Sequence, residues 1–231
     1  ACDFESIKIQ IEPEFLCFSH ATRGKALDAK SVQFLNVKQL EMVRYYCCNC
    51  SLENVEKATF ERCSDLNIEN TNNSTRLELK SCSKIKCTTI SNITNFIISS
   101  GSLQKITNLS NIESFVLEKC EGSCTITNYD NIRTAHVVDN DDISDVSFLS
   151  VCKFITLSLC DEIVSLPPIK ANKIEICSCN NIFSALPLMG CRDIFIRLCS
   201  RIRNVAKLTK TAHVEKLRYH STQSPYHNIE Y

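Results

Sequence analysis

A recurring pattern of apolar positions organises the chain. Three segments show it most clearly: Phe154–Ile163, Lys173–Ile182 and Asp193–Ile202. In each segment, apolar residues stand five and three positions before a cysteine, and an isoleucine stands three positions after it. Because side chains alternate between the two faces of a strand, the apolar-x-apolar step predicts a short β-strand before each cysteine. These anchor cysteines are Cys160, Cys179 and Cys199.

The same frame continues toward the N-terminus with successive steps of 19 or 20 residues. A unit this short cannot bury a core alone, so neighbouring units have to stack. The pattern therefore predicts a solenoid in which equivalent strands pair in parallel, with about 4.8 Å between coils. The earlier anchor positions are Asn140, Cys120, Gly101, Cys82 and Cys63. The strand positions predicted to face the core are Leu77 and Leu79, Phe96 and Ile98, Phe115 and Leu117, Ala135 and Val137, Ile155 and Leu157, Ile174 and Ile176, and Ile194 and Ile196.

This pattern resembles the leucine-rich repeat, and most closely its cysteine-containing subclass. The period is nearer to that of the short bacterial-type repeat, and Leu166-Pro167-Pro168 and Leu186-Pro187 are similar to the Leu-Pro steps of that type. The resemblance covers about residues 51–212, roughly eight coils. It implies a right-handed coil with one parallel β-sheet and short irregular convex segments. A parallel β-helix, which also stacks coils of this size, is the alternative.

The chain divides into three parts on this frame. Residues 1–50 do not fit it and are expected to form an irregular N-terminal cap, in which Ile7, Ile9 and Ile11 predict a strand. Residues 51–212 are the repeats. Residues 213–231 leave the frame and are expected to form a C-terminal cap and tail, with a last strand over His213–Leu217.

Composition narrows the function without naming it. Lys and Arg number 26, as do Asp and Glu, so no basic surface for nucleic acid is indicated. No apolar run approaches the length of a membrane span. The sequence contains no nucleophile elbow, P-loop, dinucleotide fingerprint or zinc-protease motif, so we expect no enzyme and no cofactor. Cys177 and His136 lie two coils apart, too far for a catalytic dyad.

The sixteen cysteines divide into two groups. Six occupy the anchor column, where packing explains them. Some of the other ten would form disulfides in an oxidising compartment, whereas a reducing one would leave them as small core residues. Sequons at Asn49, Asn72, Asn73, Asn92 and Asn108, and a start at Ala1 that suggests a removed segment, lead us to expect a secreted or extracellular protein, with a cytoplasmic one as the alternative. The off-column cysteines are Cys2, Cys17, Cys47, Cys48, Cys50, Cys87, Cys124, Cys152, Cys177 and Cys191.

Two candidate metal sites are unconvincing. Cys47 and Cys50 have C-x-x-C spacing, but no second ligand pair exists, so a disulfide-tied N-terminal cap is the better interpretation. Asp139-Asn140-Asp141-Asp142 lacks calcium-loop spacing and is expected to be a solvated turn. We predict no metal ligands.

The strand spacers define the candidate surface. In a leucine-rich repeat the residues between the inward positions face the concave side, and here Ile97, Val116 and Val138 are expected to form one lateral row. An apolar row with charged flanks is typical of a protein-binding patch. We therefore predict a non-catalytic module that binds another protein. A structural coat or assembly protein that self-associates, and a substrate-recognition subunit of a larger complex, are the alternatives. The predicted partner-binding residues are Glu78, Lys80, Ile97, Val116, Glu118, His136, Val138, Thr156, Leu159, Phe195 and Arg197.

Overall fold

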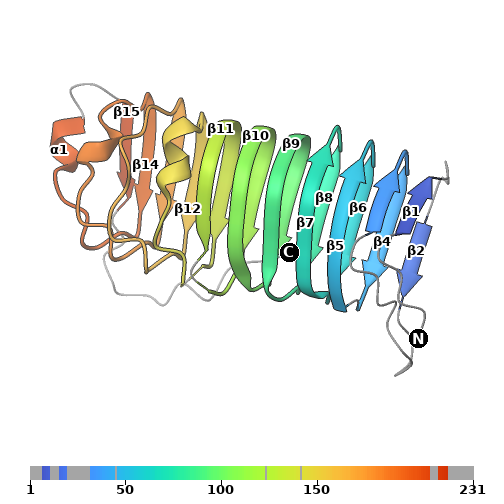
Figure 1. Cartoon of the computed structure of the whole chain (residues 1–231). Helices are drawn as coiled ribbons and strands as arrows, with labels where there is room; N and C mark the ends of the chain where they lie inside the picture. Colours follow the sequence, from blue (N-terminus) through green and yellow to red (C-terminus); the bar gives the residue numbers. More distant parts are fainter. Residues whose placement is uncertain are drawn as a thin grey trace, which may run out of the picture.

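The computed structural model describes residues 7–10, 16–19, 32–44, 46–122, 124–140, 142–208 and 213–217, without the side chains of 7–10, 16–19, 46–48 and 215–217. These residues form a parallel β-solenoid of about nine turns (Figure 1). Its strands belong to one 15-stranded sheet in which every pairing is parallel. The predicted solenoid is confirmed, and the parallel β-helix alternative also fits.

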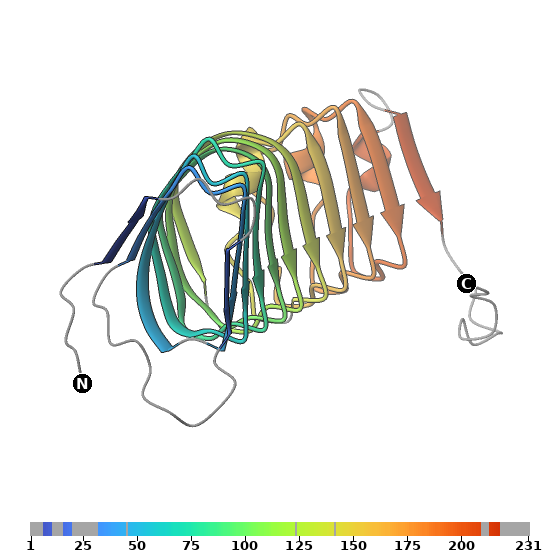
Figure 2. The same cartoon turned by 90° about the vertical axis from the view of Figure 1, so that its right-hand side faces the viewer.

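The N-terminal half of the solenoid carries strands on two sides of each coil (Figure 2). We call one side the back sheet: β1 (Ile7–Gln10), β3 (Val32–Leu35), β5 (Tyr46–Glu53) and β7 (Ser64–Asn72). The other side, the front sheet, contains the predicted apolar-x-apolar strands. It begins with β2 (Leu16–Ser19), β4 (Gln39–Val43), β6 (Lys57–Glu61) and β8 (Arg76–Lys80). The sheet thus starts well before residue 51.

Three long strands join the two sheets by running from back to front. They are β9 (Ile85–Ser99), β10 (Leu103–Glu118) and β11 (Thr125–Val138). A strand can turn in this way because residues such as Asn108 and Asn111 adopt positive φ, at 54° and 53°. Asparagine tolerates this left-handed conformation better than other side chains. Each such residue bends the chain, so the inward positions of β10 recur every third residue, at Ile106, Leu109, Ile112 and Phe115.

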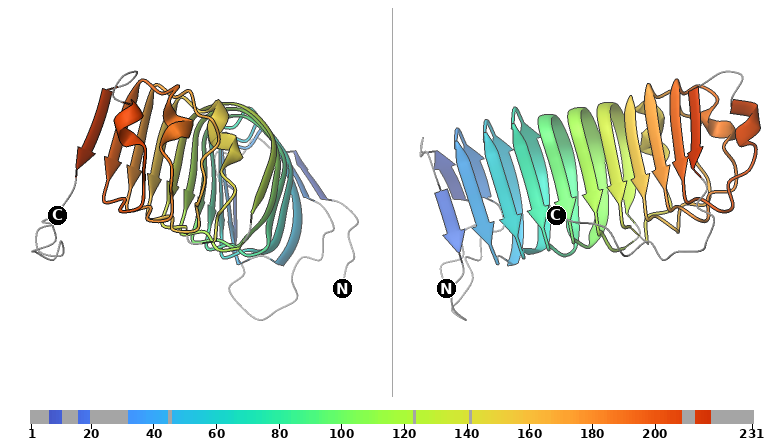
Figure 3. Two further views of the ribbon diagram at one scale, coloured as in Figure 1. Left: turned by 90° about the vertical axis from the view of Figure 1, so that its left-hand side faces the viewer. Right: turned by 180° about the vertical axis from the view of Figure 1, so that it is seen from behind.

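The C-terminal half keeps the front sheet and replaces the back sheet. The front continues with β12 (Phe154–Ser158), β13 (Lys173–Cys177), β14 (Asp193–Arg197) and β15 (His213–Leu217), the last strand that the sequence predicted. On the back lie the short helices η1 (Ser147–Val151), η2 (Leu186–Leu188) and α1 (Val205–Leu208) (Figure 3). Prolines explain part of the loss of the back sheet. Pro167, Pro168 and Pro187 have no N–H to donate to the hydrogen bonds between neighbouring strands of a sheet.

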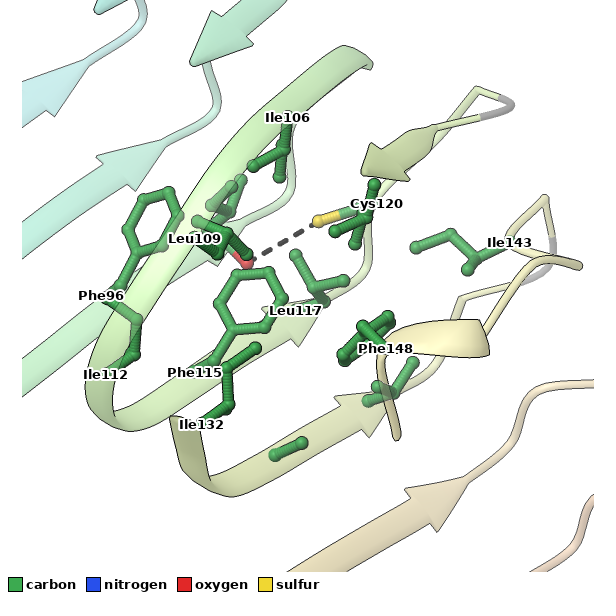
Figure 4. Close-up of a cluster of buried hydrophobic side chains, with 14 of the residues drawn as sticks. Phe96, Ile106, Leu109, Ile112, Phe115, Leu117, Cys120, Ile132, Ile143 and Phe148 are labelled. Carbon is green, nitrogen blue, oxygen red and sulfur yellow. Dashed lines mark hydrogen bonds between the residues drawn. The ribbon is translucent and has the colours of Figure 1, made fainter. Parts of the chain in front are cut away.

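The core is a set of columns in which equivalent side chains stack from coil to coil. All fourteen strand positions that the sequence predicted to face inward are buried, at 2% exposure or less. Phe96 and Phe115 stack with ring centroids 5.3 Å apart, and Phe148 of η1 meets Phe115 edge-on at 5.5 Å (Figure 4). These contacts carry the apolar core across the point where the back sheet ends.

The anchor column lies where each front strand turns into the next segment. The residue before each anchor has a positive φ, and the anchor thiol donates hydrogen bonds back to strand carbonyls. Cys120, for example, donates to the carbonyls of Ile98 and Glu118, both at 3.5 Å. Figure 4 draws one hydrogen bond of this thiol. At Gly101 a Cβ would come within 3.0 Å of the Cys82 carbonyl oxygen, which explains the glycine.

Candidate functional site

The predicted binding residues lie on the outer face of the front sheet, where strand register arranges them in two columns. The first column runs through Glu78, Ile97, Val116, His136, Thr156, Glu175 and Phe195. The second runs through Lys80, Ser99, Glu118, Val138, Ser158, Cys177 and Arg197. The structure therefore brings ten of the eleven predicted residues onto one continuous face.

The predicted lateral row needs a correction. Val138 pairs with Glu118, and the residue opposite Val116 is His136. Val138 shares a face with Ile97 and Val116 but belongs to the second column, since two residues along a strand return to the same face one column over. The apolar row on this face is thus Ile97 and Val116, with the imidazole of His136 following on β11.

Leu159 lies apart from these columns, at the corner just after β12. Its φ is 53° and its side chain is 49% exposed. Leu198 takes the equivalent place after β14, with φ 53° and 43% exposure. A left-handed leucine costs roughly 1–2 kcal/mol, so both corners carry backbone strain. The other corner residues with positive φ are Arg44, Arg62, Ser81, Ser100, Lys119, Asp139 and Ser178.

An ion cluster borders the N-terminal side of the apolar row. Glu78 is only 9% exposed, and its carboxylate lies 3.1 Å from both Arg76 and Lys80. A carboxylate this poorly hydrated needs such cationic partners. The two cations hold Glu78 beside Ile97, its neighbour on β9.

A second cluster lies at the C-terminal end of the same face. Lys173 binds Glu175 at 2.6 Å, and its Nζ lies 5.0 Å from the ring centroid of Phe195. His213 of β15 packs edge-on against Phe195 at 6.4 Å. The face therefore carries a half-buried apolar centre between two groups of charged and aromatic side chains.

The sequence reasoning missed a ladder of asparagines at the turn between the back and front sides. From Asn54 onward, each side-chain amide donates to a side-chain oxygen in the preceding coil, as Asn131 does to Asn111 at 2.7 Å and Asn111 does to Asn92 at 3.1 Å. The signal was present, because these asparagines recur every 18 to 20 residues. We call this column the asparagine ladder: Asn36, Asn54, Asn73, Asn92, Asn111 and Asn131.

The ladders also account for the sequon asparagines. Asn73 and Asn92 belong to the asparagine ladder, and Asn72 accepts the Asn92 amide at 2.8 Å. Asn108 and Asn49 bond to equivalent positions of neighbouring coils. These five residues thus have a structural role that does not involve glycans.

A shallow hollow of about 270 Å³ lies beside the asparagine ladder. Asn111, Glu113, Arg133 and Lys153 are among its lining residues, and Arg133 binds Glu113 at 2.6 Å. Because the Arg133 guanidinium is already paired with Glu113, the hollow is a polar surface feature without an evident ligand.

The cysteines within the described side chains are all thiols, twelve in number, so the disulfides expected among Cys50, Cys87, Cys124, Cys152, Cys177 and Cys191 are not formed there. Cys2, Cys17, Cys47 and Cys48 lie outside those side chains. Burial raises the pKa of Cys120 to about 11 and of Cys152 to about 12. The Cys179 thiol donates to Cys160, which lowers the pKa of Cys160 and raises that of Cys179. Among the described residues, no three His, Cys, Asp or Glu side chains gather to hold a metal ion.

Comparisons with known proteins found no match. No protein-family model matches the chain, and neither a curated protein nor a solved structure matches it. In the part of the chain that the structure describes, every helix is too short or too polar to cross a membrane.

Proposed function

We propose that the chain is a non-catalytic protein-binding module of leucine-rich-repeat type, and that the outer face of its front sheet contacts the partner. The observation that supports this proposal is the arrangement around Ile97 and Val116. These β-branched side chains stand half-buried in one column, between the Glu78 ion cluster and His136.

The arrangement matches the anatomy of a protein interface, in which an apolar centre is surrounded by polar and charged side chains. The front sheet is also continuous from β2 to β15, which offers an extended surface to a partner. A rigid sheet of this kind holds its side chains in fixed register, so little entropy is lost when a partner binds.

The proposal is tested by placing a photo-crosslinking amino acid at His136 or at Thr125. Both belong to β11, but His136 lies in its front half and Thr125 in its back half. A partner of the front sheet forms a crosslink from position 136 and not from position 125. Equal crosslinking from both positions, or no crosslink from 136 in the cells that express the protein, would overturn the proposal.

A further inference from the structure

Exposed apolar side chains gather on the back of the last coils. The described residues contain six large hydrophobic side chains that are exposed, and all lie between residues 159 and 198. Four of them stand on the back segments that replace the back sheet. Their exposed fractions are 50% for Val164, 46% for Phe183, 38% for Leu186 and 51% for Met189. We call these four residues the back patch.

Cations lie against the back patch on both sides. Gly190 follows Met189 directly, and the Lys170 side chain lies against it. A Cβ on Gly190 would come within 2.8 Å of Lys170 Cγ. On the other side, the Arg201 guanidinium carbon lies 5.9 Å from the centroid of the Phe183 ring.

The following coil adds two more cations. The backbone N–H of Arg203 donates to the Phe183 carbonyl at 2.9 Å, so Arg203 adjoins the patch directly. Lys207 belongs to α1, which packs on η2. Four cationic residues thus lie on the segments that border the four apolar side chains.

Acidic residues are scarce on this side of the C-terminal coils. From Ile163 to Leu208 the chain has seven Lys and Arg residues but only two acidic ones, Glu175 and Asp193. Both belong to front strands, β13 and β14, where Glu175 pairs with Lys173. The nearest acids on the turns are Asp161 and Glu162, and Asp161 accepts the backbone N–H of Asn180 at 2.8 Å. The back patch therefore combines exposed apolar side chains with an excess of positive over negative charge.

We propose that the back patch binds the surface of an anionic lipid bilayer, with the four apolar side chains entering the interface and the four cations contacting the headgroups. Each Lys or Arg near such a surface contributes a favourable electrostatic term, and stable anchoring needs both this and apolar insertion. The patch supplies both. It lies on the other side of the coil from the front sheet, so this inference goes beyond the proposed partner binding.

Size and shape favour a bilayer over an acidic protein. Four partly exposed side chains offer on the order of a few hundred Å² of apolar surface, well below the roughly 800 Å² per partner of a stable protein interface. Leu186 belongs to η2, Phe183 and Met189 lie in the segments on either side of it, and Val164 lies in the preceding coil. Helix η2 itself lies on the back of the solenoid (Figure 3). Projecting side chains suit insertion into a soft, flat surface.

The test is co-sedimentation of the full chain with vesicles of phosphatidylcholine alone, or of phosphatidylcholine and phosphatidylserine in a roughly two-to-one ratio. We expect binding to the anionic vesicles only, weakened by salt. The double variants Leu186→Ser/Met189→Ser and Lys170→Glu/Lys207→Glu should each bind about tenfold more weakly. These side chains are exposed, and thermal melting checks that the fold is kept.

A charge-matched control separates the back patch from net charge. Lys173→Glu/Arg197→Glu makes the same charge change on the front strands β13 and β14 and should retain most of the binding. Failure to bind anionic vesicles, equal binding to neutral ones, or an equal loss in the control variant would overturn the proposal. Binding of poly-glutamate without binding of vesicles would also overturn it, in favour of an acidic protein partner.

Discussion

Asn140 Oδ1 accepts a hydrogen bond of 2.8 Å from the backbone N–H of Cys120 in the preceding coil. The Asn140 amide also donates to the carbonyls of Leu117 and Val138, at 2.9 and 2.8 Å. Asn140 is fully buried, and its one side chain satisfies three backbone groups, two of them through buried hydrogen bonds and one through a part-buried one. In the other coils, except that of Gly101, a cysteine thiol occupies this place and donates to strand carbonyls.

Replacement of Asn140 by alanine should lower the free energy of unfolding by about 3 kcal/mol, because three backbone groups lose their partner, two of them in buried hydrogen bonds. Asn140→Cys should lower it by less, since the thiol donates to the same carbonyls in neighbouring coils. Denaturant unfolding of the two variants measures both values. If Asn140→Cys were as destabilising as Asn140→Ala, a role for the anchor thiols as donors would be ruled out.

The asparagine ladder should owe its stabilising effect to φ as much as to hydrogen bonding. Asn111 has φ 53° and bonds to Asn92 and Asn131. Asn111→Ala loses both features and should cost about 1–2 kcal/mol, whereas Asn111→Gly keeps the conformation and should cost less. Thermal unfolding of the two variants measures both losses of stability. A larger loss of stability in Asn111→Gly than in Asn111→Ala would assign the effect of Asn111 to its side-chain hydrogen bonds alone.

The inward side of β7 contains a hydroxyl that the core does not satisfy. Thr71 is fully buried in a column with Leu52 and Ile90, and its Oγ1 has no hydrogen-bond partner among the described residues. Thr71→Val should therefore raise the free energy of unfolding by about 1 kcal/mol. Thr107→Val is the control, because the hydroxyl of the half-buried Thr107 donates to the Cys87 carbonyl at 3.4 Å. Stabilisation by both substitutions, or by neither, would contradict this account.

The buried thiols should make the protein sensitive to alkali. The pKa of Cys120 is raised by burial from 9.0 to about 11. Between these values the unfolded chain releases the proton while the folded chain keeps it, so the stability that this thiol contributes below pH 9 is lost as pH rises toward 11. Denaturant midpoints measured across this range should fall, and less steeply for Cys120→Ser. An equal slope for both proteins would show that Cys120 does not contribute.

The front sheet was predictable from sequence, and the back sheet was not. Pairs such as Ile155 and Leu157 alternate with spacers at period two, the ordinary signature of a strand. Residues of β10 such as Ile106 and Leu109 are three apart, because Asn108 between them bends the strand with a positive φ. A search for period two misses such a strand, although the recurring asparagines mark each bend.

The candidate face was predicted residue by residue, but its columns were not. Alternation places Val116 and Val138 on the same face, whereas only the pairing register decides that His136 is the neighbour of Val116. The cations around Phe183 were also hidden, because they belong to different coils and meet only when the coils stack.

The most direct test of the proposed function compares two aspartate substitutions in the affinity of the chain for the protein that crosslinks at position 136. Val116→Asp places a charge at the apolar centre of the front sheet, and Thr125→Asp places one on the exposed back sheet. We predict a loss of at least about tenfold for Val116→Asp, measured by isothermal titration calorimetry, and no change for Thr125→Asp. Unchanged affinity in the Val116 variant would contradict the assignment of the front sheet as the binding face.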